Sequence, residues 1–327
     1  MLGDPTIMVS DLDLVRDVTV KNFNAFRNRI KDPVLQYKPW TDNLLYLEDD
    51  HWKHVRGQLS PTFSAGKLKR MVPAIERVAK NLQNYIKSKA ESGEEVELKH
   101  LSQCYAIDAI AGVAFGLQVD SLNDPNDPFI KHAKDFAANS FFLKVIGSAL
   151  EDRRHEQKKY GDFLQLLVDA EREGEAQGPV DAEIDHSHHL KTSSHWTRKG
   201  LTTDEVYGNT LIFLLAANET VNTVMSFTLF SLAANPDCLA KAQAEVDAKL
   251  GKKPVNYDTA MELTYLDMCL NETMRLYPPG YFLDRQIAED MEFGGYHIKK
   301  GWRLAVPAFT IHRDPSIWPD PMKFDPE

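Results

Sequence analysis

The sequence has 327 residues, of which 43% are hydrophobic and 26% are charged, and these proportions exclude a disordered or fibrous chain. It carries 38 basic and 48 acidic side chains, so its formal net charge is −10. Binding to nucleic acid requires a basic face, and because this composition provides none, we expect no nucleic-acid partner. The length is compatible with two domains or with one large domain.

Three cysteines, Cys104, Cys238 and Cys269, are too few and too widely spaced for a disulfide framework, which favours a reducing compartment. The longest apolar run, residues 211–217, is far shorter than the roughly 18 residues that a membrane span requires. The first residues have neither the basic region nor the apolar core of a signal peptide. We therefore expect a soluble globular chain.

Apolar side chains recur every three to four residues through much of the first half of the sequence, a period that is typical of packed helices. Ser10 is placed to cap the first of these helices, which is expected to end near Lys21. Further helices are predicted over residues 49–57, 66–88, 98–115 and 152–175.

A polar segment over residues 174–200, rich in glycine and histidine, lacks any apolar period and is predicted to be a solvated linker. Thr202 and Glu205 then have the spacing of a capping box, which starts a helix that runs to Asn235 before Pro236. This helix is roughly 45 Å long. Because its middle is apolar on nearly every side, it should be central and buried.

The last part of the sequence changes from helical to strand-like periodicity. Two helices, a hairpin and a strand are predicted in turn, over residues 236–250, 264–276, 291–298 and 303–306. The expected fold class is therefore mainly α, with a small β region near the C-terminus.

Polar residues stand inside the long apolar helix, where burying an acid is costly. Glu219 and Thr220 follow the small residues Ala216 and Ala217, which would let a flat ligand approach the backbone. Thr220 can donate to the carbonyl of Ala216 and so open the helix locally, freeing polar groups for water or a ligand. On these residues alone, a mildly polar helix with Glu219 in solvent is the simpler interpretation.

Two further pairs lie at helical spacing. Trp52 and Arg56 could hold an anionic group at the indole edge, or could simply pack on each other. Glu272 and Arg275, taken by their spacing alone, are an exposed ion pair worth a few tenths of a kcal/mol.

In their order along the chain, these patterns resemble the cytochrome P450 superfamily. The ordered set comprises Trp52-x-x-x-Arg56, Ala216-Ala217-x-Glu219-Thr220, Glu272-x-x-Arg275 before Pro278-Pro279, Arg285, His312-x-x-Pro315, and Trp318-Pro319-Asp320-Pro321-x-x-Phe324-Asp325-Pro326-Glu327. Each pattern is weak alone, whereas the whole order is specific. The spacing is similar to the animal microsomal type, near the thromboxane-synthase and drug-metabolising branch.

This resemblance implies one cytochrome P450-type helical domain over residues 1–327, with haem b as its cofactor. The implied activity is a monooxygenase that inserts one oxygen atom from dioxygen into a lipophilic small molecule. In this family an NADPH-dependent reductase supplies electrons, and the full-length proteins are associated with the endoplasmic reticulum membrane.

The resemblance also implies a role for each residue that matches a motif. Trp52, Arg56 and Arg285 would bind the haem propionates, since carboxylates suit guanidinium forks and an indole donor. Thr220 would donate a hydrogen bond to dioxygen, and Glu219 would help to relay protons. The remaining roles are cofactor contact on the distal side for Ala216, a buried structural ion pair for Glu272 and Arg275, and substrate contact for Leu215, Ala216, Gly280 and Tyr281.

Departures from the family pattern qualify these expectations. Ala217 stands where the family has glycine, and Val221 stands where it has a hydroxyl residue. The helices that roof the substrate pocket are largely missing between Ala149 and Arg153. We expect the domain to be incomplete at both ends, without the membrane anchor at its start and without the proximal cysteine loop after Glu327.

None of the three cysteines stands in a motif that could replace the proximal ligand, so we expect this chain alone to be inactive and to hold no thiolate-ligated haem. The alternative function is a non-catalytic helical scaffold that binds apolar ligands or partner proteins. A zinc site in the polar segment is a third hypothesis, but the irregular spacing of His186, His188, His189 and His195 is poor for a closed site, and no metal site is predicted.

Overall fold

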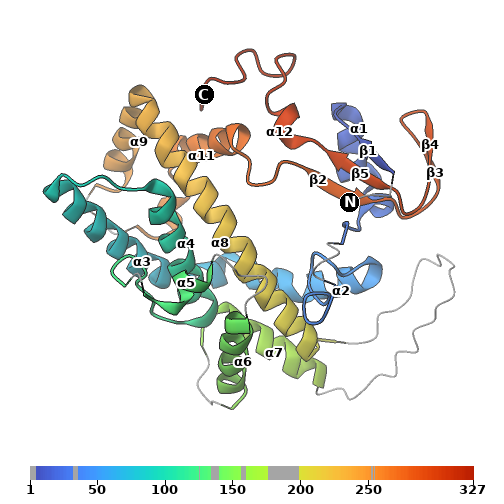
Figure 1. Cartoon of the computed structure of the whole chain (residues 1–327), viewed down its shortest axis with the longest axis horizontal. Helices are drawn as coiled ribbons and strands as arrows, with labels where there is room; N and C mark the ends of the chain where they lie inside the picture. Colours follow the sequence, from blue (N-terminus) through green and yellow to red (C-terminus); the bar gives the residue numbers. More distant parts are fainter. Residues whose placement is uncertain are drawn as a thin grey trace.

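The computed structural model describes residues 5–31, 36–124, 126–133, 140–155, 160–175, 199–251, 253 and 255–327. The long helix α8 (Thr203–Ala234) crosses the middle of the molecule, as Figure 1 shows. Helices α3 (Ala65–Ser92) and α4 (Leu98–Phe115) lie on one side of it, and α4 packs along α8.

The capping box predicted at the start of α8 is confirmed. The Thr202 hydroxyl accepts from the Glu205 amide at 3.2 Å, and the Glu205 carboxylate accepts from the Thr202 amide at 2.7 Å. At the other end, Pro236 begins α9 (Pro236–Lys249), so both predicted bounds are confirmed. Among the described helices, α8 alone is long and apolar enough to cross a membrane, a test that a core helix also passes.

The prediction that α8 is central is confirmed, but the prediction that it is buried is wrong along one face. On that face the apolar side chains of Phe227 and Phe230 remain 37% and 50% exposed. Elsewhere α8 packs on α4 and on α11 (Thr264–Leu276), whereas two cavities adjoin the exposed face. An apolar helix therefore runs through the centre with one side open.

The main core lies between α8, α4, α6 (Ser140–His155) and α7 (Phe163–Glu175). The prediction of one helix over residues 152–175 is wrong, because α6 and α7 are separate. The Asp162 carboxylate accepts from the Gln165 amide at 3.0 Å and from Arg153 at 2.6 Å, so it caps α7 rather than continuing a helix.

A three-stranded sheet has the order β1 (Thr6–Met8), β5 (Arg303–Val306), β2 (Leu283–Gln286), with β1 parallel and β2 antiparallel to β5. The predicted hairpin is present as β3 (Met291–Phe293) and β4 (Tyr296–Ile298). Together with α1 (Leu12–Arg16) these strands enclose a second core, separate from the helical one.

The first helix differs from its prediction. Asp11, not Ser10, caps α1, because its carboxylate accepts from the Leu14 amide at 3.0 Å. A π-helical turn, Asp17–Lys21, then replaces the expected α-helix. The remaining helices are α2 (Asp49–Leu59), α5 (Pro128–Ala133), α10 (Tyr257–Ala260) and α12 (Ala308–Ile311). Most of the predicted linker, residues 176–198, lies outside the described residues together with its four histidines.

Candidate functional site

A cavity of about 420 Å³ opens between α2, α8 and β2. Trp52 and Arg56 from α2, Ala216 from α8 and Arg285 from β2 all line it. The structure therefore brings together four residues that the sequence singled out in three separate segments.

Arg285 is buried, and among the residues that the structure describes it has no carboxylate partner. It is 8% exposed, one terminal nitrogen donates to the Asp284 carbonyl at 2.7 Å, and its Nε has no hydrogen-bond partner. Burial, followed by the positive charge of Arg29, lowers the pKa of Arg285. The Asp284 carboxylate accepts from the Ile30 amide at 3.1 Å and lies 3.9 Å from Arg29 instead. A buried guanidinium with an unused donor favours an anionic ligand at this place.

Three more arginines line the same cavity. Arg27 pairs with Asp49 at 2.9 Å, and Arg29 pairs weakly with Asp284. Arg56 is exposed, and within the described part of the chain its guanidinium makes no hydrogen bond or ion pair. Arg56 and Arg285 are thus the two guanidiniums available to a ligand, and each can bind one carboxylate through a fork of donors.

The open face of α8 carries the polar residues Glu219 and Thr220. The Thr220 hydroxyl donates to the Ala216 carbonyl at 2.7 Å, as the sequence predicts, but α8 continues through this turn without a break. Ala216, Glu219 and Thr220 are all exposed. Asn218 points the other way and is 1% exposed, with both polar side-chain atoms unpartnered.

Glu219 and Tyr281 line a second cavity, of about 540 Å³, that runs along the same helix. Its wall is aromatic: Phe227 stacks on Tyr277 with ring centroids 4.3 Å apart, and Tyr281 meets Phe309 edge-on at 5.3 Å. Thr220 lies between the residues that line the two cavities without lining either of them.

The four positions expected to face a substrate do not share one cavity. Ala216 lines the first cavity and Tyr281 the second. Leu215 packs against the main core, and Gly280 is exposed with open space beside it. The structure thus distributes these four positions between two cavities, the main core and the surface.

Comparison with known proteins decides the family, because the family model described as Cytochrome P450 matches residues 1–327. The chain belongs to the cytochrome P450 family. It is 35% identical to mouse cytochrome P450 3A41 over 362 residues and to human cytochrome P450 3A7 over 360 residues, covering 99% of this chain and 67% of each relative. Mouse thromboxane-A synthase is 33% identical over 368 residues, covering 98% of this chain and 69% of that protein.

These matches confirm the superfamily and the branch to which the motifs point. Cytochromes P450 are haem monooxygenases, which use dioxygen, lipophilic substrates and a redox partner. Their haem b is held through a cysteine thiolate. No observation on the described residues favours the non-catalytic scaffold over this activity.

The residues of the first cavity fit one edge of such a haem. Its two propionates match the two available guanidiniums, and the orphaned Nε of Arg285 is a donor without an acceptor in the protein. None of the three cysteines lines this cavity. Burial raises the pKa of the Cys104 thiol to about 12 and that of Cys269 to about 11, so both stay protonated.

Glu272 and Arg275 form a bidentate ion pair with both N–O distances at 2.7 Å, and each residue is at most 8% exposed. Arg275 also donates to the carbonyls of His312 at 2.7 Å, Pro321 at 2.8 Å and Lys323 at 3.1 Å. The pair thus joins α11 to the C-terminal segment and lines none of the cavities described here.

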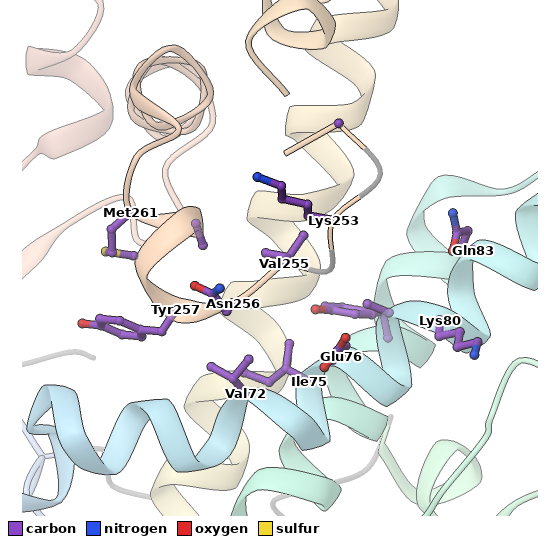
Figure 2. Close-up of a pocket in the computed structure, with 14 residues that line it drawn as sticks. Val72, Ile75, Glu76, Lys80, Gln83, Lys253, Val255, Asn256, Tyr257 and Met261 are labelled. Atoms are coloured by element: carbon purple, nitrogen blue, oxygen red, sulfur yellow. The ribbon is translucent and has the colours of Figure 1, made fainter. Parts of the chain in front are cut away.

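Another cavity, of about 1030 Å³, lies away from these residues, between α3 and the segment that includes α10. Figure 2 shows Val72 and Ile75 of α3 on one side of it, with Val255 and Tyr257 opposite. It contains none of the motif residues of the cytochrome P450 family.

Sequence reasoning missed Arg27 and Arg29, although they double the positive charge of the first cavity. The backbone of Asn28 between them bridges to Gln286, which brings both arginines beside Arg285. The available signal was the placement of Arg27 and Arg29 on the same side of an extended stretch, two residues apart. A stretch of three residues does not reveal that it pairs with a strand more than 250 residues away.

Proposed function

We propose that residues 1–327 form a single domain that binds the propionate edge of haem b in the cavity between α2, α8 and β2. The observation that carries this proposal is the buried guanidinium of Arg285, which has an unused donor and, within the described ranges of the chain, no carboxylate partner. Arg56 lines the same cavity from α2, so two carboxylates can be bound at once.

Each lining residue then has a physical task. Arg56 and Arg285 bind the propionates through charge-assisted hydrogen bonds, and Trp52 offers an indole N–H beside them. Ala216 presents only a methyl group, which lets a flat ring lie against α8. The haem, when bound, activates dioxygen so that one oxygen atom enters a lipophilic substrate and the other leaves as water.

Proton delivery is proposed for the open face of α8. The Thr220 hydroxyl donates to the Ala216 carbonyl, and rotation about its side chain can redirect that proton outward. Glu219 is exposed beside an aromatic cavity, so it can exchange protons with water and pass them along the helix face. Ala217 and Val221 bring no further hydroxyl to this route.

The electron donor and the cellular location are proposed from the resemblance to the microsomal cytochromes P450. We propose an NADPH-dependent reductase as the electron donor and the endoplasmic reticulum membrane as the location, as for the microsomal type. We propose that the thiolate ligand is none of Cys104, Cys238 and Cys269, because none of them stands in a motif of the family's proximal cysteine and burial keeps the thiols of Cys104 and Cys269 protonated.

Titration of the protein with haemin, followed by absorbance, tests the proposal. Replacing Arg285→Met or Arg56→Met removes one charge-assisted clamp and is expected to weaken haemin binding about 10-fold. The control is Arg77→Met, because Arg77 donates to the Leu117 carbonyl at 3.1 Å outside the cavity. Equal affinity of wild type and R285M would contradict the proposal. A thiolate-type Soret band of the reduced carbon monoxide complex would contradict the exclusion of the three cysteines.

A further inference from the structure

The side of α2 that faces the start of α8 carries two histidines at a spacing of three residues. His51 Nε2 lies 2.6 Å from the Glu205 carboxylate, and His54 Nε2 lies 2.8 Å from the Gly200 carbonyl. Because residues three apart lie on one helix face, both contacts join the same side of α2 to the chain around the first turn of α8.

Glu205 is an unusual partner for a surface helix. Its side chain is 2% exposed, and one carboxylate oxygen already accepts from the Thr202 amide as part of the capping box. Removing a partner from a buried carboxylate is strongly destabilising, so each donor to Glu205 contributes to the stability of this contact. His51 supplies one such donor from α2.

The segment that precedes α2 contacts the first two turns of α8. Leu44 donates its amide to the Asn209 side chain at 3.1 Å, and Lys38 pairs with Asp204. A Cβ atom on Gly208 would lie 2.5 Å from the Pro39 carbonyl oxygen, so only glycine permits this close approach. The first turns of α8 therefore form a dock for the chain that leads into α2.

We propose that His51 is a positioning residue for the propionate clamp, by which we mean Trp52, Arg56 and Arg285. It directly precedes Trp52, and Arg56 follows little more than one turn later in the same helix, so a shift of α2 at His51 moves both clamp residues together. The bond to Glu205 fixes α2 relative to α8, and with it the separation of Arg56 from Ala216 across the cavity. This inference rests on the proposed function, because it assigns His51 a part in the same site.

Four variants test the role. His51→Leu removes the donor at similar volume, whereas His51→Gln keeps an N–H for Glu205 and is the conservative rescue. His297→Leu is the matched control, because it breaks the other described histidine–glutamate pair, His297 with Glu292 at 3.1 Å, on the β3–β4 hairpin. If H51L does not fold, H51L/E205Q replaces it, since glutamine keeps the capping box without leaving a buried charge.

Two measurements are made on each variant. Amide hydrogen exchange of the peptide that covers α2 reports, without any ligand, whether the contact of His51 with Glu205 (the tie) holds α2 in place. Haemin titration reports the affinity of the propionate clamp. We expect H51L, or its double variant, to exchange about 10-fold faster in α2 and to bind haemin about 10-fold more weakly. H51Q and H297L should match the wild type in both measurements.

The outcomes separate this inference from the proposed function. Unchanged exchange in α2 of H51L overturns the inference, whatever happens to haemin. Faster exchange with unchanged haemin affinity also overturns it, because the tie then does not position the clamp. If wild type binds no haemin, the proposed function fails and the positioning role fails with it, whereas the exchange data still show whether the tie exists.

Discussion

Removal of the Arg275 guanidinium should destabilise the protein more than removal of any exposed charge. Arg275→Met leaves the Glu272 carboxylate buried, with the Asp325 amide at 2.9 Å as its remaining described partner. It also leaves three carbonyls of the C-terminal segment, at His312, Pro321 and Lys323, without their donor.

The size of the loss follows from burial. Breaking a buried ion pair by removing one partner costs about 3–5 kcal/mol, because an uncompensated charge remains. Both residues are at most 8% exposed, so little solvent screening reduces this figure, and we expect about 4 kcal/mol. Domains are stabilised by roughly 5–15 kcal/mol in total, so the variant should be close to the limit of folding.

Urea unfolding followed by tryptophan fluorescence measures this loss, since the Arg275 guanidinium carbon lies 4.7 Å from the centre of the Trp318 ring. Replacing both partners, as in R275M/E272M, should restore at least half of the lost free energy because no buried charge is left. Lys241→Met, which removes an exposed pair with Glu327, is the control and should not shift the midpoint. A loss below about 1 kcal/mol for R275M would refute the reasoning.

Three further predictions concern the scaffold. Gly208→Ala should cost about 1–3 kcal/mol, because its Cβ would meet backbone oxygens of the segment before α2. Gly57→Ala, in the last turn of α2 with open space beside it, should stabilise by about 0.5–1 kcal/mol, and thermal unfolding of both variants checks this. Burial raises the pKa of Asp108 from 3.8 to about 6, so its contribution to stability is present below about pH 4 and is lost as the pH rises through 6. The unfolding free energy of the wild type should therefore fall relative to D108N over this interval, and a constant difference would contradict the assignment. Cys104 and Cys269 should resist alkylation at pH 8, whereas the partly buried Cys238 should react faster than either, as mass spectrometry of the native protein will show.

Local signals in the sequence were sufficient for the long helices α3, α4 and α8, whereas they did not separate α6 from α7. Thr202 with Glu205 fixes the start of α8, and Pro236 fixes its end, because capping and proline act within one turn of the chain. The short strands β1 and β2 could not be predicted in this way. Each has only three or four residues and exists because β5 pairs with both, which is a long-range property.

The candidate site likewise combines features that the sequence predicted with features that depend on long-range packing. The motif order was enough to single out Trp52, Arg56, Ala216 and Arg285, and the fold gathers them around one cavity. The open face of α8 could not be foreseen, because hydrophobic periodicity records which side chains are apolar but not whether a neighbour covers them. The tie of His51 to Glu205 was equally hidden, since it joins residues 154 positions apart.

The most direct test of the account is a crystal structure of this chain with haemin bound. We expect the two propionates to lie within hydrogen-bond distance of the Arg56 and Arg285 guanidiniums, with the porphyrin plane against Ala216. Haemin seated elsewhere, for example in the cavity between α3 and α10, with Arg285 still unpartnered, would contradict the central claim.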